Sequence, residues 1–599
     1  MYITLKCSKA CEKGIKMKKT SFYIQNIIIA IPLIILMTIT SCKPTDNLTS
    51  SSSASLSNVI SESEEISSDV QSSDSTSNES VLSISDNSST SSSFSSLPPK
   101  SIASSSISSS ITSKPYVKPI PPDVELAQKG SILQISETAN IDKLNGFGTE
   151  WDPHFWMPYN TKYETGESDW KTITDRILEI GIDRVRVMWL PMWHEITNDN
   201  GDPAIANMDM FFFNENNKEL ASLKRQLDFC QKNGIKVTLA YWGPTRQSWI
   251  GSKYEGNWWN APYSDDEYVE NIAILLKYLT VTCKYSVVDE FCSFNEPSLG
   301  YYNKDGKIVF AEYRDMMRKL DTRLKNDGIR NKVRLIASDD SSSRGNIGSG
   351  EMNGLNWFEK NAIALKITGD VFSTHSYRFL LEDSNEDIVF DMKAYFDILK
   401  KYSPNKPLMV HEFGTSNYAD AYHVNDLETY ARALMLPKFA VNLLNAGGAG
   451  ALYWILYDQL YYEGAEKDAK MSTGLWGFKT ENWRIRKMYH SWGLLTKYTS
   501  ADSLIYKGQS EDPDLCIAAL KDKKGLTTYL IVNTAKNSKQ FTIKTPVTKL
   551  AYFDKYVFDK TKASSASDKL TGPDQRIPCS KNTIVGEIGA ESFIVLREA

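Results

Sequence analysis

Two glutamates stand where a short apolar run ends and a loop begins. Glu296 lies in Phe-Asn-Glu-Pro, residues 294–297, and Glu412 lies in Val-His-Glu-Phe-Gly, residues 410–414. A retaining sugar hydrolase needs one carboxyl group to protonate the leaving oxygen and a second to attack the anomeric carbon, held about 5 Å apart. Strand ends are rigid enough to hold two side chains at such a separation. The placement of Glu296 and Glu412 therefore predicts glycosidase chemistry.

The elements around these glutamates alternate between strands and helices. The apolar runs predict eight strands, at Gly146–Trp151, Arg184–Leu190, Lys236–Trp242, Val288–Asn295, Val333–Ser338, Val371–Tyr377, Pro407–Phe413 and Gly450–Ile455. Apolar residues at three- and four-residue spacing predict helices at Trp170–Ile180, Lys218–Asn233, Asp266–Thr282, Ala311–Asp327, Asp387–Tyr402 and Leu427–Asn445. This alternation predicts an α/β fold with a (β/α)8 TIM barrel. The first strand is followed by no G-x-G-x-x-G fingerprint, which argues against a doubly wound dinucleotide-binding sheet.

The barrel constrains where the two glutamates lie. Active sites of such barrels are at the C-terminal ends of the strands. Glu296 ends the fourth predicted strand and Glu412 ends the seventh, so their side chains can converge on one sugar ring at the barrel mouth.

At these residues the sequence resembles a known family. With Asn295-Glu296-Pro297 as its sharpest motif, the segment from about 140 to 495 resembles the retaining glycoside hydrolases of clan A, the four-seven superfamily of (β/α)8 barrels. Families 5, 39 and 30 are nearest. The opening residues 145–151 look more like families 39 and 30, and residues 240–244 lack the histidine common in family 5. The resemblance implies that Glu296 is the general acid/base and Glu412 the nucleophile.

The resemblance also implies supporting roles for residues at other strand ends. Asn295 would donate to the sugar 2-hydroxyl, and Arg186 would keep the nucleophile ionised, as a nearby cation does for a carboxylate. His375 and Tyr377 match the family's His-x-Tyr, with the tyrosine hydrogen-bonded to the nucleophile, and Trp454 resembles the aromatic floor of the subsite. Taken singly, Arg186 could be a structural ion-pair partner, His375 a buried histidine and Trp454 a core residue.

Further polar and aromatic residues lie near the predicted strand ends. The expected sugar platforms of the mouth are drawn from Trp151, Trp156, Trp189, Trp193, Trp242, Trp258 and Trp259, with Trp151 and Trp242 at strand ends. The remaining carboxyl groups are interpreted as substrate hydrogen-bonders or loop caps: Glu150, Asp152, Glu195, Asp339, Asp340 and Asp458.

The first forty residues predict export. Lys16, Lys18 and Lys19 precede an apolar run from Ile27 to Met37, which has the length of a secretory signal and is too short to span a bilayer. The run ends in Ile-Thr-Ser-Cys, residues 39–42, which resembles a bacterial lipobox. On this interpretation residues 1–42 are a signal peptide, and a lipid on Cys42 anchors the protein to the outer face of a bacterial cell membrane. A plain cleavage site with an incidental cysteine is the alternative.

Composition divides the rest of the chain into three parts. Residues 43–122 are dominated by serine and end in a cluster of prolines, which predicts a disordered linker, stiffened before the folded part. The barrel is expected over 123–495. Residues 496–599 read as strands alone, which predicts a β-sandwich that either accompanies the barrel structurally or binds glycan.

Several classes of function are disfavoured. A net charge of −5 gives no basic footprint for nucleic acid. His411-Glu412 does not begin an H-E-x-x-H zinc motif because position 415 is threonine, and the scattered cysteines show no C-x-x-C pair, so no metal or cofactor is expected.

The sequence as a whole therefore predicts a lipid-anchored extracellular enzyme that hydrolyses β-linked glycans by double displacement. A non-catalytic surface glycan-binding lipoprotein and a transglycosylase that uses the same residues are the alternatives.

Overall fold

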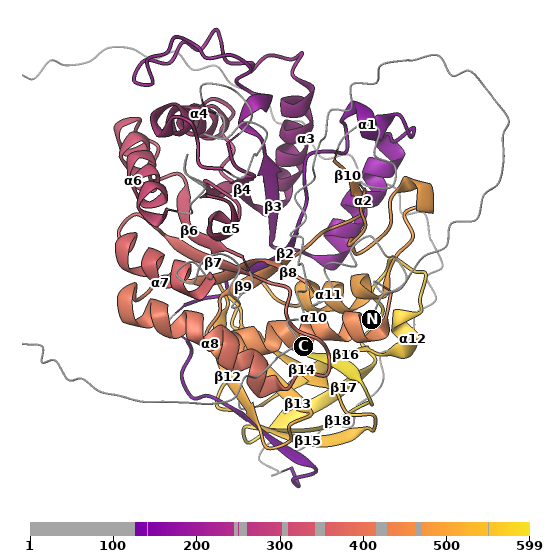
Figure 1. Ribbon diagram of the computed structural model, residues 1–599. Coiled ribbons are helices and arrows are strands. Elements are labelled where there is room, and N and C mark those ends of the chain that lie inside the picture. The colour runs from indigo at the N-terminus through magenta and orange to yellow at the C-terminus, as the bar shows by residue number, and fades with distance from the viewer. Residues whose placement is uncertain are drawn as a thin grey trace, which may run out of the picture. The chain divides into compact units, whose positions relative to one another are not determined.

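Eight parallel strands close into a barrel, which the computed structural model shows with its helices around it (Figure 1). The strands are β2 (Gly146–Glu150), β3 (Arg184–Trp189), β4 (Lys236–Tyr241), β5 (Val288–Cys292), β6 (Arg334–Asp340), β7 (Val371–Ser376), β8 (Leu408–Phe413) and β9 (Gly450–Tyr453). Each coincides with a strand expected from the sequence, which confirms the predicted barrel.

A helix follows each barrel strand. These helices are α2 (Glu167–Ile180), α3 (Lys218–Asn233), α4 (Asp265–Lys277), α6 (Phe310–Asn326), α7 (Gly354–Ala364), α8 (Asn385–Tyr402), α10 (Tyr430–Ala446) and α11 (Lys487–Lys497). A π-helical turn, η2 (Tyr278–Thr282), extends α4. The shorter elements of the barrel are α1 (Pro158–Thr161), α5 (Pro297–Gly300), η1 (Pro191–Trp193), η4 (Lys479–Glu481), β10 (Gln459–Leu460) and β11 (Lys470–Met471).

The structure describes residues 126–140, 142–244, 250, 260–301, 309–341, 354–414, 428–461, 470–548 and 550–599. The predicted signal peptide with Cys42 and the predicted linker lie outside these residues, as do Trp258 and Trp259. In the described part of the chain no helix has the length and apolar character needed to span a membrane.

Local sequence signals set where the barrel helices begin and end. The Asn217 side chain caps α3 by accepting from the backbone N–H of Leu220 at 2.8 Å. Gly234 ends the same helix with a φ of 70°, and Gly447 ends α10 with a φ of 109°. These left-handed conformations favour glycine, which explains why each of the two helices ends at one.

Alternation along the strands separates the barrel interior from the surrounding core. On β3, Arg186 forms ion pairs inside the barrel and Met188 packs with the small interior cluster that includes Ala240, Ile336 and Met409. The intervening Val187 belongs to the larger core between the strands and the helices. Odd and even positions of a barrel strand therefore have different neighbours, which decides which side chains can reach the mouth.

The C-terminal strands form a sheet of their own. Its strands are β12 (Leu504–Ser510), β13 (Leu515–Lys521), β14 (Thr527–Asn533), β15 (Lys539–Lys544), β16 (Leu550–Phe558), β17 (Gln575–Ser580), β18 (Thr583–Ile588) and β19 (Ser592–Glu598), with the short helix α12 (Lys560–Ala563) after β16. The all-β character expected of 496–599 is confirmed, and hydrogen bonds between the strands close them into a ring.

A strand from the other end of the described chain completes this ring. β1 (Ser131–Ile135) pairs antiparallel with β12 and parallel with β15. By its hydrogen bonds it belongs to the C-terminal sheet, although the sequence placed it in the barrel segment 123–495. The sheet contacts the barrel through α10, where Asn445 donates to the carbonyl oxygen of Ile517 at 3.0 Å (Figure 1).

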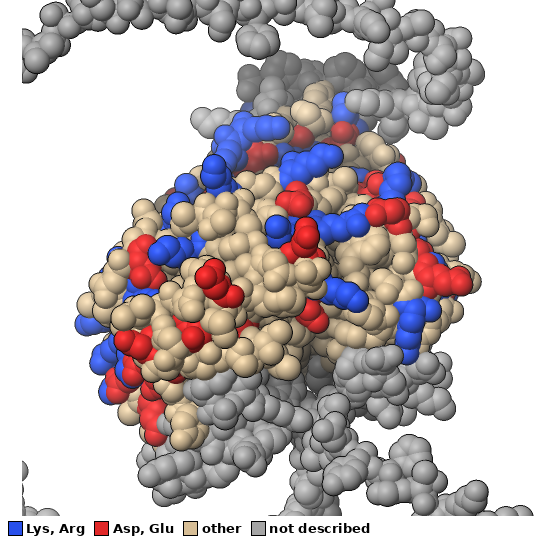
Figure 2. All heavy atoms as spheres, turned by 90° about the horizontal axis from the view of Figure 1, so that it is seen from above, with Lys and Arg blue, Asp and Glu red and all other residues tan. Residues whose placement is uncertain are grey.

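The surface carries charges of both signs. Figure 2 shows lysine and arginine side chains interspersed with aspartate and glutamate over the face seen from above. A protein that binds nucleic acid usually concentrates its basic residues on one face. The described part of this face offers no such concentration.

Candidate active site

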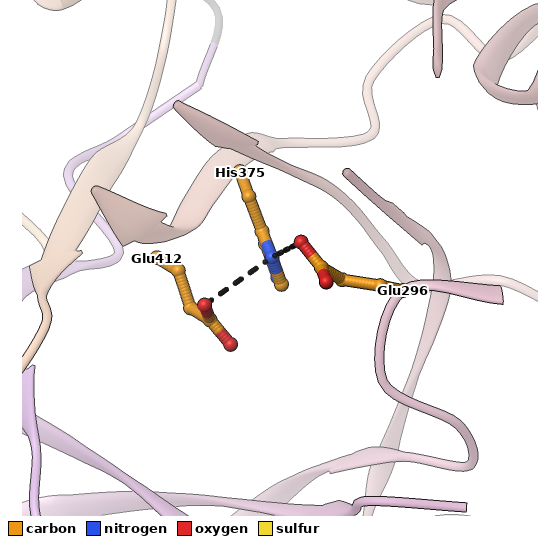
Figure 3. Close-up of side chains that lie close together, drawn as sticks. All are labelled: Glu296, His375 and Glu412. Carbon is orange, nitrogen blue, oxygen red and sulfur yellow. Dashed lines mark hydrogen bonds and ion pairs between the residues drawn. The ribbon is translucent and has the colours of Figure 1, made fainter. Parts of the chain in front are cut away.

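Glu296 and Glu412 meet at the C-terminal end of the barrel. One carboxylate oxygen from each lies within 4.8 Å of the other and of a ring nitrogen of His375. Nδ1 of His375 is 2.9 Å from Glu296 and 3.4 Å from Glu412, so the imidazole lies between the two carboxylates (Figure 3). The structure thus brings together the pair that the sequence singled out.

Local backbone conformation positions both glutamates. Glu296 precedes α5 with a φ of 48°, and the neighbouring Asn295 N–H donates to the carbonyl oxygen of Tyr241 at 2.9 Å, which fastens this loop to β4. In β8 the register shifts against β7, so that Thr374 faces Val410 but His375 faces Glu412. The extra residue, His411, lets both His411 and Glu412 reach the barrel interior.

Arg186 is the centre of the charged network beneath the pair. Its guanidinium is fully buried and contacts Glu412 at 2.6 Å, Asn295 at 2.7 Å, Asp339 at 2.9 Å and Glu150 at 3.2 Å. Burial lowers the pKa of Arg186, but the surrounding carboxylates outweigh this and hold it well above its usual value. A permanent positive charge therefore lies directly beside Glu412.

Glu412 is bound on both carboxylate oxygens. Arg186 holds Oε1, and the hydroxyl of Tyr377 donates to Oε2 at 2.9 Å. Burial raises the pKa of Glu412, while the charges of His375 and Arg186 oppose that increase. Its side chain is 8% exposed against 27% for Glu296, so Glu296 has the readier exchange of protons with solvent.

His375 is held as a cation by its neighbours. Burial lowers its pKa, but the charges of Glu412 and Asp339 outweigh burial and hold the pKa well above its usual value. Nε2 lies 3.4 Å from Asp339 on the side away from the glutamates. His375 therefore connects Asp339 to the glutamate pair.

The sequence underestimated Asp339, which it grouped with loop caps and substrate contacts. Asp339 is fully buried and accepts from Arg186, from the hydroxyl of Ser373 at 2.6 Å and from the thiol of Cys292 at 3.2 Å. Burial raises its pKa, but Arg186 and His375 outweigh burial and hold the pKa well below its usual value. A register shift between β6 and β7, with a φ of 45° at Asp339, turns this side chain inward, and no sequence signal marks that shift.

Glu150 also contacts Arg186, but its pKa is shifted in the opposite direction from that of Asp339. It lies on β2, almost completely buried, and burial raises its pKa well above the usual value despite Arg186. The next carboxyl group, that of Asp152, accepts from the Met188 N–H and from the hydroxyl of Tyr461, each at 2.7 Å. Glu150 and Asp152 therefore both accept hydrogen bonds from residues of β3. Asp458 instead forms a buried ion pair with Arg486 at 2.6 Å.

The tryptophans divide between the mouth and the core. Trp454 lies in the barrel interior and makes an edge-to-face contact with the half-buried Trp242, with ring centroids 6.1 Å apart at 88°. The prediction that Trp151 lies at this site is wrong. Trp151 is fully buried, and its ring stacks on that of Trp170 in α2, with centroids 5.5 Å apart. Because Glu150 faces the interior, alternation turns its neighbour Trp151 outward to the helices.

The other tryptophans named for the mouth differ in exposure. Trp189 is fully buried against Trp193, with ring centroids 4.9 Å apart, so it offers a sugar no face. Trp193 is partly buried and also contacts His154 at 5.8 Å. Trp156 lies under the guanidinium of Arg225 at 3.9 Å. Trp242 and Trp193 are both only partly buried, so part of each side chain stays accessible.

Known proteins resemble this chain in structure rather than in sequence. No protein-family model matches the sequence, and no curated protein does. The chain is similar to a family 30 endoxylanase from Clostridium papyrosolvens, at 14% identity and a TM-score of 0.52, over 78% of this chain and 100% of that one.

Two further solved structures show the same likeness. An endo-β-1,6-glucanase has 15% identity and a TM-score of 0.53, over 78% of this chain and 94% of its own. A family 51 arabinofuranosidase from Xanthomonas axonopodis has 13% identity and a TM-score of 0.53, over 79% of this chain and 100% of its own. The chain therefore shares the fold of these three structures.

Proposed function

We propose that this chain is a retaining β-glycoside hydrolase. The observation that carries the proposal is the pair Glu296 and Glu412, with oxygens within 4.8 Å of each other at the barrel mouth. Retaining glycosidases hold their carboxyl groups about 5–5.5 Å apart, whereas inverting enzymes leave room for a water between them. The separation here favours direct attack on the sugar by a carboxylate.

The two carboxyl groups take different roles in this mechanism. Glu412, oriented by Arg186 and Tyr377, attacks the anomeric carbon while Glu296 gives its proton to the leaving oxygen. The leaving group departs as an alcohol, and the sugar remains bound to Glu412 as a covalent glycosyl ester. Glu296, now a base, takes a proton from water, which attacks the same carbon from the opposite side and restores the β configuration.

Asn295 is oriented for the sugar by Arg186. Because its amide oxygen accepts from Arg186 at 2.7 Å, its amide nitrogen is left to donate elsewhere. A hydrogen bond from that nitrogen to the 2-hydroxyl strengthens as charge develops on the ring. Trp454 and Trp242 supply aromatic surface around the same sugar.

The substrate and the location follow from the rest of the chain. We infer a β-linked glycan outside the cell, reached by a barrel that is carried on the serine-rich linker 43–122 and anchored to the outer face of the membrane through lipidated Cys42. Xylan and β-1,6-glucan, the substrates named for two of the similar structures, are the first polymers to assay.

Covalent labelling tests the proposal directly. The full chain is incubated with a panel of 2-fluoro β-glycosides, which form the glycosyl ester but hydrolyse it slowly, and its intact mass is measured. We expect a sugar-sized increase that maps to the peptide containing Glu412, and no increase in Glu412→Gln. Oligosaccharide binding without label or turnover would instead identify a glycan-binding protein, and new glycosides formed at the expense of hydrolysis would identify a transglycosylase.

Tyr377→Phe should lower kcat without preventing catalysis. The substitution removes the hydrogen bond to Oε2 of Glu412, and hydrogen bonds to charged groups contribute about 1.5–3 kcal/mol, which corresponds to about 10- to 100-fold in rate. Steady-state kinetics on the best substrate checks this. Tyr453→Phe is the matched control, because it removes a buried hydroxyl that donates to Thr473 at 2.8 Å, away from Glu412, and should leave kcat unchanged.

A further inference from the structure

A second histidine lies in the barrel interior, next to the charged network of the proposed site. His411 of β8 is fully buried, and the shift of register that brings Glu412 inward brings His411 inward as well. Its ring nitrogens face two carboxylates: Nδ1 is 3.4 Å from Oδ1 of Asp339, and Nε2 is 3.6 Å from Oε2 of Glu290. Neither nitrogen has a hydrogen-bond partner of ordinary length among the described residues. The proposed mechanism gives this imidazole no role.

Glu290 has a full set of donors without the imidazole. Its Oε1 accepts from Arg334 at 2.6 Å and from the side chain of Asn145 at 2.8 Å. Its Oε2 accepts from the hydroxyl of Thr238 at 2.7 Å and lies 3.0 Å from Arg184. A carboxylate offers about four lone-pair sites, and these donors occupy them. Glu290 therefore needs no further proton donor.

Asp339 is less completely satisfied. Among the described residues it has three close donors, and only one of them, the hydroxyl of Ser373, is on Oδ1. The same oxygen lies 3.4 Å from Nε2 of His375 and 3.4 Å from Nδ1 of His411. An N–H on Nδ1 of His411 would therefore face a carboxylate oxygen that still has room for a donor.

The surroundings of His411 favour a neutral ring. The charged groups that face it are Asp339 from β6, Glu290 from β5 and Arg186 from β3. Burial lowers the pKa of His411, and the two carboxylates oppose this only in part. A neutral imidazole carries one N–H, so it can donate toward only one of the two carboxylates.

We propose that His411 is a positioning residue that turns its Nδ1–H toward Asp339 and so stabilises this carboxylate as an anion. Asp339 pairs with Arg186 and His375, the two cations next to Glu412. His411 therefore acts on the nucleophile through other residues, without touching substrate. Its effect on rate rests on the proposed hydrolysis, whereas the position of its proton does not.

Two amide substitutions separate the two ring nitrogens. The amide nitrogen of asparagine can take the place of Nδ1, and that of glutamine the place of Nε2. His411→Asn thus keeps a donor toward Asp339, and His411→Gln keeps one only toward Glu290. We expect His411→Asn to retain the kcat of the parent and His411→Gln to lose about tenfold, the contribution of one hydrogen bond to a charged group, with little change in KM. A purely structural role would affect both variants, because each places an amide in the same buried space.

Nitrogen NMR of the full chain observes the proton of His411 directly. The chain has only six histidines, so isotope-labelled histidine gives few ring signals, and those missing from His411→Asn belong to His411. We expect a neutral ring protonated on Nδ1. His194 is the internal reference for the opposite tautomer, because its Nδ1 accepts from the indole N–H of Trp189 at 3.0 Å and its Nε2 is 3.2 Å from the carbonyl oxygen of Asn271.

His490→Gln is the matched control for activity. His490 is a buried histidine of α11 whose Nε2 is 3.0 Å from the carbonyl oxygen of Ser565, and glutamine can retain that donor. This variant should keep the kcat of the parent. The proposal is overturned if His411 carries its proton on Nε2 or on both nitrogens, or if His411→Asn and His411→Gln have the same kcat. A chain that takes up no covalent label and hydrolyses no glycan would overturn the proposed function, and the NMR result would still decide where the proton lies.

Discussion

Glu412→Gly should abolish hydrolysis of the natural glycan and yet form a new product when azide is added. Loss of the nucleophile removes the covalent route, with an expected fall in kcat on the order of 10⁴-fold or more. The glycine leaves a space that admits a small anion. Azide entering there attacks an activated β-glycoside from the side that Glu412 occupied and gives an α-glycosyl azide. NMR of the product establishes the configuration.

Glu296→Gly provides the opposite result and therefore the control. Substrates with a good leaving group need no protonation, so Glu412 can still form the covalent ester. Azide then takes the place of water on the side of Glu296 and gives a β-glycosyl azide. For natural leaving groups the rate should fall by about 10²–10⁴-fold, the usual contribution of general acid–base catalysis. The proposal fails if both variants give the same anomer, or if Glu412→Gly hydrolyses the glycan as the parent does.

The barrel could be predicted because its strands and helices carry strong periodic signals. The runs at Arg184–Leu190 and Lys236–Trp242 coincide with β3 and β4 to within one residue at each end. The strands of the C-terminal ring were harder to identify. β1 pairs with β15 across about four hundred residues of sequence, and β17 contains Pro578, so neither has a local signal strong enough to reveal it.

The site itself was predicted less completely, for a different physical reason. Strand alternation places Arg186, His375 and Tyr377 on the interior side, and the structure agrees. Irregular backbone then adds residues that alternation would exclude: shifts of register bring Asp339 and Glu412 into the interior. Alternation also places Trp151 outside the barrel interior, because its neighbour Glu150 faces inward. A residue count along a strand cannot reveal such shifts, because they are fixed by pairing with neighbouring strands.

Asp339→Asn should damage both activity and stability, whereas Glu150→Gln should have little effect on either. Both carboxyl groups are buried against Arg186, at 2.9 Å and 3.2 Å. The pKa of Asp339 lies well below its usual value, so the amide removes a charge that pairs with Arg186 and His375. Breaking such a buried pair costs about 3–5 kcal/mol. The pKa of Glu150 lies well above its usual value, so glutamine there removes less negative charge than asparagine removes at position 339.

The pH dependence of these differences distinguishes charge from shape. A lowered pKa in the folded state stabilises the protein above the unfolded-state pKa of about 3.9 and is lost as the pH falls through the folded-state value. The difference in unfolding free energy between the parent and Asp339→Asn should therefore be full at pH 7 and shrink in acid, while that for Glu150→Gln stays small at neutral pH. Asp339→Asn should also shift the pH profile of kcat/KM, because the pKa of His375 falls when its anionic neighbour is lost. Equal losses in the two variants at neutral pH, with unchanged pH profiles, would mean that Asp339 acts by packing and not as the anion that holds Arg186 and His375 beneath Glu412.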